Sequence, residues 1–338
     1  MQYNPALDGV RALSILAVVS FHCETPWGDG GFIGVDVFFV LSGYLITTLL
    51  LEEHRHGGIA IGAFYIKRAL RLYPTLLLLI AAYVTLSPLL RPADDRWLAA
   101  GAAGFYVMDY ALAFWHISWT IGHTWSLGVE EKFYLLWPLL LPALLRTRRP
   151  ITWLLAAFIL VTGWRYATAL TWNWDQAYFS FDTRMSGIVL GTIGAVMRPQ
   201  VSKPVAFVAC AVLAFCIAAP FMPSLPLRLP NEAVTLEITL AEVAGFALIC
   251  HLAEHGGSGF FASRPMAYIG RLSYGIYVWH FPFVLLLRDD HAQPWWVTLP
   301  ATLVFSFAMA AICLHLVDVP LKRWRKQASS TPGHSAVA

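Results

Sequence analysis

Apolar stretches of membrane-spanning length dominate the chain, and short polar or basic stretches separate them. A helix needs about 20 consecutive, mostly apolar residues to cross a bilayer. The candidate segments are, in order, 7–27, 32–51, 70–90, 97–115, 127–146, 151–170, 185–198, 204–222, 234–254, 268–288 and 296–317. The pattern therefore predicts an all-α fold, a polytopic bundle of membrane helices.

Basic residues gather between these segments and predict how the chain is oriented. The clusters occupy residues 55–71, 146–149, 198–203, 264–271 and 322–326. Cytoplasmic loops carry an excess of lysine and arginine, so an even number of spans should separate any two clusters. Three apolar segments lie between the first two clusters, and the Gly/Ala-rich segment 97–115 is the best candidate for a re-entrant or non-spanning one. We therefore expect about ten transmembrane helices with both termini in the cytoplasm.

The composition agrees with a membrane protein. Hydrophobic residues make up 58% of the chain and charged residues only 13%, against about 25% charged residues in a typical soluble domain. The net charge of +3 does not point to an acidic polymer, so we expect the lipid bilayer and no nucleic acid among the partners. One membrane domain is expected over 1–327, followed by a disordered Ser/Thr/Pro tail over 328–338.

The first two apolar segments carry ionisable residues. Arg11 and His22 are eleven positions apart, which places them on one helix face and about 16 Å apart along the axis. Such residues inside a membrane segment usually face a bundle interior or a wet cavity and mark function. Asp36 is expected near His22, where a carboxylate would fix the imidazole tautomer. The alternatives are that Arg11 snorkels, that His22 caps its helix, that Asp36 neutralises an arginine, or that His22 pairs with Cys23.

A second basic feature lies in the stretch FYIKRALRLYP, residues 64–74. Arg68 and Arg71 are three residues apart and share a helix face. Two guanidinium groups on one face suit a phosphate or pyrophosphate, which they can bind through paired hydrogen bonds. Anchoring of the cytoplasmic end of a helix is the alternative.

Six stretches taken together resemble the acyltransferase 3 family of bacterial integral membrane O-acyltransferases. They are LDGVRALSILAVVSFH (7–22), GFIGVDVFFVLSGYLIT (31–47), FYIKRALRLYP (64–74), HTWSLGVEEKFYLLWP (123–138), RMSGIVLGTIGA (184–195) and IGRLSYGIYVWHFP (269–282). They come in the family's order and cover almost the whole chain. The resemblance is to a stand-alone form without the fused periplasmic esterase-like domain of larger members.

The resemblance implies an activity. Members transfer an acyl group, commonly acetyl, from cytoplasmic acyl-CoA to a hydroxyl of a carbohydrate or glycosylated acceptor, such as a cell-envelope polysaccharide, lipopolysaccharide, peptidoglycan or a macrolide. Acyl-CoA, expected to be acetyl-CoA, is then a co-substrate, and no permanently bound cofactor is expected. The location implied is the bacterial cytoplasmic (inner) membrane. A transporter or flippase for a glycan or lipid intermediate is the rival interpretation.

The resemblance also assigns roles to residues. Arg11, Arg68 and Arg71 would bind the acyl-CoA, and His22 would serve the transfer step. The family's marked acid after the WSL motif corresponds to Glu130, which would orient the acceptor or assist proton movement.

Four further residues are expected on the acceptor side of the bundle, and they are His123, Trp125, Arg184 and His280. Aromatic faces suit sugar rings, although tryptophan is also common at membrane interfaces, and His280 could equally be a packing residue. No metal site is expected, since the histidines lack ligand spacing with Cys, Asp or Glu.

Overall fold

The computed structural model describes residues 3–115, 117–171, 173–218, 231, 233–256 and 259–320. All regular elements within these ranges are helices, so the predicted all-α fold is confirmed. The predicted tail, 328–338, lies outside the described residues.

Each predicted apolar segment corresponds to helix over its described residues, and 219–222 of the segment 204–222 lie outside them. The long helices are α1 (Pro5–His22), α2 (Gly34–Arg55), α3 (Ile61–Leu90), α6 (Trp125–Leu145), α7 (Pro150–Thr171), α10 (Ser186–Met197), α11 (Lys203–Ala218), α12 (Ile238–His255), α13 (Arg264–Leu285) and α14 (Trp295–Cys313). The main difference in boundaries is that α3 begins nine residues before the predicted start at residue 70. Arg68 and Arg71 therefore lie within this helix, where their side chains have a fixed direction.

The segment 97–115 is divided into two short helices, α4 (Arg96–Gly104) and α5 (Met108–Phe114). They are about 14 Å and 10 Å long, whereas a bilayer core is about 30 Å thick. Between them Tyr106 has a φ of 55°, which ends α4. The Lys132 ammonium of α6 donates to the Tyr106 carbonyl at 2.5 Å and to Asp109 Oδ1 at 2.6 Å, which holds the break against α6. Neither piece is long enough to cross a membrane.

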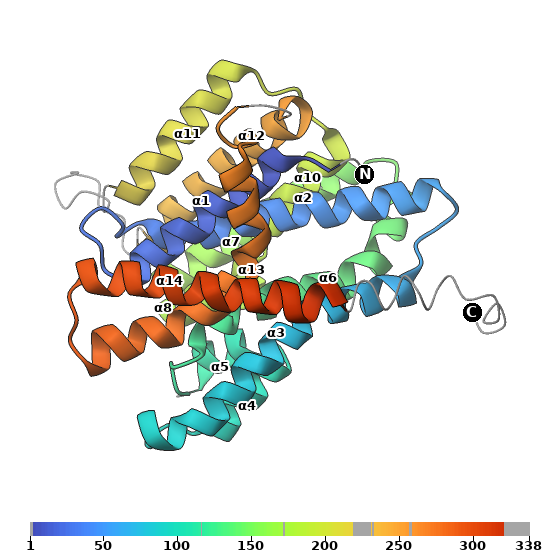
Figure 1. Ribbon diagram of the computed structural model, residues 1–338. Coiled ribbons are helices and arrows are strands. Elements are labelled where there is room, and N and C mark those ends of the chain that lie inside the picture. Colours follow the sequence, from blue (N-terminus) through green and yellow to red (C-terminus); the bar gives the residue numbers. More distant parts are fainter. Residues whose placement is uncertain are drawn as a thin grey trace.

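The helices differ in how much of their apolar surface is buried. Figure 1 shows their arrangement, with α11 and α4 at opposite ends of the view. The most apolar stretch of α1 is 67% buried, and that of α2 with its preceding turn is 72% buried. The corresponding stretches of α7 and of α14 with its following turn are only 28% buried. The less buried helices expose large apolar side chains, among them Leu89, Leu139, Leu160, Phe207 and Val304. Because such a surface is unfavourable in water, these side chains are suited to contact with lipid. Within the described part of the chain, six helices are both long and apolar enough to span.

Helix α1 packs along α13, and the two run in the same direction. At one end Gly270 lies against the backbone of Asp8, where an added Cβ would come within 1.9 Å of the Asp8 carbonyl oxygen. At the other end His280 hydrogen-bonds to His22. Two parallel spans must be separated by an odd number of other spans. This direction agrees with a bundle in which 97–115 does not cross.

Candidate active site

Three histidines meet at the end of α1, and we call them the histidine cluster: His22, His123 and His280. His22 Nδ1 lies 2.9 Å from His280 Nε2 on α13. The His123 ring, in the short helix η2 (Gly122–Thr124), lies 5.6 Å from the His280 ring, measured between centroids. Phe281 closes the cluster with its ring 4.6 Å from that of His22. The structure thus brings together three of the residues that the sequence singled out.

The backbone determines which ring nitrogens in this cluster carry hydrogen. His280 Nδ1 lies 2.7 Å from the carbonyl oxygen of Tyr277, and His123 Nε2 lies 3.0 Å from that of Val278. A carbonyl can only accept, so both nitrogens donate. Both rings are buried, with 0% of His280 and 2% of His123 exposed. His123 Nδ1 has no partner among the described residues.

The backbone at the end of α1 is also held from outside the helix. Arg288, in the π-helical turn η4 (Leu286–Asp290), donates from Nη1 to the His22 carbonyl at 2.7 Å. It also pairs with Glu24 at 3.3 Å. A cation at a helix C-terminus is favoured by the helix dipole. His22 is therefore fixed through its backbone as well as its ring.

Three arginines form a second group, the arginine cluster: Arg11, Arg68 and Arg71. Arg11 Nη1 lies 3.2 Å from Asp8 Oδ1, and the Arg68 guanidinium lies over the Tyr134 ring at 3.4 Å and 3.5 Å from Glu131. Arg71 is within electrostatic range of the other two arginines, and its side chain is exposed. It forms no hydrogen bond or ion pair with the residues that the structure describes.

Glu130 belongs with the arginine cluster. Its Oε1 accepts a hydrogen bond from the Ser42 hydroxyl at 2.5 Å, and Ser42 also hydrogen-bonds to Tyr134. Its carboxylate is within electrostatic range of Arg68 and Arg11. The described contacts of Glu130 are thus with the arginine cluster and its neighbours, whereas the resemblance suggested that it orients the acceptor or assists proton movement.

The expected pairing of Asp36 with His22 is wrong. Asp36 Oδ1 accepts from Arg184 Nη2 at 2.7 Å, and both side chains are fully buried. The reason lies in the connection between the helices. Gly34 packs against Ser14, where an added Cβ would come within 2.4 Å of the Ser14 carbonyl oxygen. Since Ser14 precedes His22 by eight residues, α2 begins about 12 Å along α1 from the level of His22.

A second buried ion pair was missed at the sequence level. Arg165 on α7 donates to Glu242 on α12 at 3.0 Å, and Ser186 hydrogen-bonds to both. Their presence in apolar segments was a usable signal, since ionisable residues within membrane helices are rarely incidental. Ser42 and Tyr134 were also missed, and no local pattern marks them.

Trp125 and Arg184 lie together near an aromatic wall. The Arg184 guanidinium is 5.2 Å from the Trp125 ring and 4.9 Å from the Tyr178 ring. Trp174 stacks on Tyr178 with 4.7 Å between ring centroids. Arg184 is thus engaged by Asp36 and two aromatic rings, while its Nε and Nη1 have no hydrogen-bond partner among the described residues. A role on the acceptor side stays a prediction.

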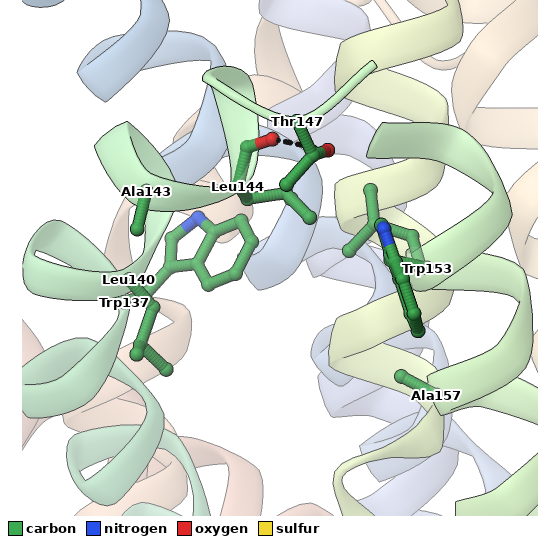
Figure 2. Close-up of a pocket in the computed structure, with 8 residues that line it drawn as sticks. Trp137, Leu140, Ala143, Leu144, Thr147, Trp153 and Ala157 are labelled. Atoms are coloured by element: carbon green, nitrogen blue, oxygen red, sulfur yellow. Dashed lines mark hydrogen bonds between the residues drawn. The ribbon is translucent and has the colours of Figure 1, made fainter. Parts of the chain in front are cut away.

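A pocket lies between α6 and α7, and no member of either cluster lines it (Figure 2). Figure 2 shows Trp137 and Trp153 on opposite sides of it, and the Thr147 hydroxyl turned to the Leu144 carbonyl, to which it donates at 2.7 Å. Its walls are otherwise apolar, and Trp153 is 61% exposed. It has no titratable lining residue and is suited to contact with lipid tails.

Helix α1 contributes one residue to each cluster, Arg11 to the arginine cluster and His22 to the histidine cluster. Among the described residues, no group of three or more His, Cys, Asp or Glu side chains is arranged to hold a metal ion. A family described as an acyltransferase domain matches residues 4–317. The chain belongs to the acyltransferase 3 family. The resemblance seen in the six sequence stretches is therefore confirmed, and both clusters fall within this acyltransferase domain.

Named relatives cover nearly the whole acyltransferase domain. Peptidoglycan O-acetyltransferase OatA of Listeria monocytogenes is 31% identical over 95% of this chain and 56% of its own length. O-acetyltransferase OatA of Staphylococcus aureus is 30% identical over 95% of this chain and 58% of its own length. The chain thus spans a little over half the length of these relatives. No solved structure matches it.

Proposed function

We propose that this acyltransferase 3 protein moves an acetyl group from acetyl-CoA to a hydroxyl of a cell-envelope carbohydrate. The observation that carries the proposal is the presence of two unlike clusters to which α1 contributes one residue each. Arg11 belongs to the arginine cluster, and His22 belongs to the histidine cluster about 16 Å further along the same helix. A donor with an anionic head and a long arm ending in a thioester suits that separation.

The arginine cluster supports a role in binding the phosphates of CoA. Guanidinium groups bind phosphate through paired, charge-assisted hydrogen bonds. Three guanidinium groups within electrostatic range repel one another, and an anion relieves that repulsion. Arg71 is the group best suited to it, because it is exposed and forms no ion pair within the described residues. On the expected topology this cluster faces the cytoplasm, where acyl-CoA is found.

The histidine cluster supports a role in the transfer step. The acceptor hydroxyl attacks the thioester carbonyl, so a C–O bond forms as the C–S bond breaks. His22 takes the hydroxyl proton and returns it to the sulfur, which leaves as the CoA thiol. A positioned imidazole contributes roughly 10²–10⁴-fold to such a reaction. The products are the acetyl ester of the acceptor and free CoA.

Peptidoglycan is the acceptor that the relatives suggest, since one of them is named for it. The wall formed by Trp125, Trp174 and Tyr178 supports a carbohydrate acceptor, because aromatic faces pack well against sugar rings. On the expected topology this wall and the histidine cluster lie toward the outer side of the cytoplasmic membrane.

A transfer assay in lipid nanodiscs tests the proposal. The purified protein is incubated with acetyl-CoA carrying a labelled acetyl group and with soluble peptidoglycan fragments, and the products are analysed by mass spectrometry. We expect label in an alkali-labile ester on the fragments and release of free CoA thiol. Transport of fragments into sealed vesicles without acetylation would contradict the proposal and favour the flippase.

A further inference from the structure

His22 and His280, 258 positions apart in the chain, are joined by a hydrogen bond and not only by packing. This bond connects two ring nitrogens, so one must donate and the other must accept. Which one donates decides whether the other nitrogen of His22, Nε2, can take a proton.

The direction follows from the other bond of His280. Its Nδ1 donates to the Tyr277 carbonyl at 2.7 Å, which places the ring hydrogen on Nδ1. In a neutral imidazole the second nitrogen then has a free lone pair. His280 Nε2 therefore accepts, and His22 Nδ1 donates to it. This leaves His22 Nε2 unprotonated.

The surroundings of His280 favour its neutral form. The ring is fully buried and lies against Tyr277, Phe281 and His123. No carboxylate pairs with it among the described residues. A buried charge without a partner carries a large desolvation cost. A protonated His280 would donate to His22 Nδ1 and move the hydrogen of His22 to Nε2, which would then be unable to act as a base.

We propose that His280 is a positioning residue that fixes the tautomer of His22. This inference rests on the proposed function. It adds that a neutral histidine, His280, orients His22 in the way that a carboxylate often does. When His22 Nε2 accepts the proton of the acceptor hydroxyl, the bond from His22 Nδ1 to His280 becomes charge-assisted and stronger. The proton then passes to the departing thiolate, and the original tautomer returns.

A matched pair of substitutions separates this role from packing. Gln in His280→Gln offers a carbonyl oxygen that can accept from His22 Nδ1, whereas Met in His280→Met has similar length but no comparable acceptor. We expect kcat to fall about 100-fold or more in His280→Met and less than about tenfold in His280→Gln. The KM for acetyl-CoA should stay unchanged in both, since the arginine cluster is intact. A packing role predicts that Met is tolerated at least as well as Gln, and that result would overturn the assignment.

A spectroscopic test needs no variant and no activity. ¹⁵N spectra of histidine-labelled wild-type protein in lipid should show His22 neutral, with its hydrogen on Nδ1. In His280→Met the resonances of His22 should shift toward a mixture of both tautomers. A wild-type His22 with its hydrogen on Nε2 would exclude the proposal. Absence of acetyl transfer in the wild type would instead count against the proposed function, and the tautomer measurement would still stand.

Discussion

The arginine cluster and the histidine cluster each include one residue of α1, Arg11 and His22, but they differ in charge and in exposure. Arg11, Arg68 and Arg71 hold like charges together, and Arg71 is exposed with no ion-pair partner in the described chain. In the histidine cluster the two rings other than His22 are buried, and backbone carbonyls fix their hydrogen positions. An excess of accessible charge is what an anion requires, whereas proton transfer requires a neutral ring in a defined tautomer.

The ion pairs formed by Asp36 with Arg184 and by Arg165 with Glu242 provide a useful contrast. Both are completely buried, and each carboxylate faces a guanidinium within 3.0 Å. In each pair the formal charges cancel, although Asp36 Oδ2 and the Arg184 atoms Nε and Nη1 have no hydrogen-bond partner among the described residues. The net charge of these pairs is therefore zero, whereas that of the three arginines is not.

Replacing the proton acceptor should have the largest effect on catalysis. His22→Ala removes the proposed base while leaving the arginine cluster intact, so we expect acetyl transfer to fall about 10³-fold. Binding of acetyl-CoA, measured by calorimetry, should be unchanged. His291→Ala, which alters an exposed histidine near the same end of the bundle, serves as the control and should keep wild-type activity. Unimpaired transfer in His22→Ala would show that the base is elsewhere.

Removing one partner of the buried ion pair between Asp36 and Arg184 should mainly lower the stability of the protein. Asp36→Asn leaves Arg184 as a buried charge without its carboxylate, which should cost about 3–5 kcal/mol of stability. The thermal midpoint in detergent should fall clearly, whereas Asp29→Asn, at an exposed site in the neighbouring loop, should leave it unchanged.

Neutralising both partners tests whether Asp36 also acts in catalysis. The double variant Asp36→Asn with Arg184→Gln has no uncompensated charge and should recover part of the lost stability. Activity that returns with stability would mark the pair as structural. Activity that stays lost in a stable double variant would argue for a catalytic Asp36.

Removing the unpaired cation should weaken donor binding. Arg71→Gln loses charge-assisted hydrogen bonds to phosphate, each contributing about 1.5–3 kcal/mol, so we expect the KM for acetyl-CoA to rise roughly 10–100-fold with little change in kcat. Lys67→Gln removes an exposed charge from the same helix and is the matched control. Equal effects of the two substitutions would mean that only the general positive potential matters.

The smallest effect is expected for Tyr277→Phe. The Tyr277 hydroxyl donates to the His123 carbonyl at 2.5 Å and lies 2.7 Å from the Ser126 hydroxyl, so its loss should cost about 1 kcal/mol. His280 is held by the Tyr277 backbone, which the substitution retains, so kcat should change less than about tenfold. Tyr268→Phe, at a more exposed site on α13, is the control for the thermal midpoint. A collapse of kcat would show that the hydroxyl itself takes part in the reaction.

The features predicted correctly from the sequence are those that depend on local spacing. The apolar segments became helices because each can bury or expose a continuous apolar face, and Arg11 and His22 lie on one helix as their interval requires. Pairing between distant helices could not be read in this way. Asp36 lies 148 residues from Arg184, and its level against α1 depends on how Gly34 packs on Ser14. The short connection between α1 and α2 suggested that Asp36 lies level with His22 along α1, but the packing of the two helices shifts Asp36 away from that level.

Close contacts between glycines and the backbone of α1 hold this helix in a fixed position. An added Cβ would come within 1.9 Å of the Asp8 carbonyl oxygen at Gly270, 2.4 Å of that of Ser14 at Gly34, and 2.1 Å of that of Ala17 at Gly31. Backbone packed this closely at three heights leaves α1 little room to slide. The distance between the two clusters is then fixed, and the donor itself would have to be long enough to extend from one to the other. On the proposed function, the bundle would select its thioester by the length of the carrier arm as well as by its phosphates, and short thioesters without that arm would be poor donors.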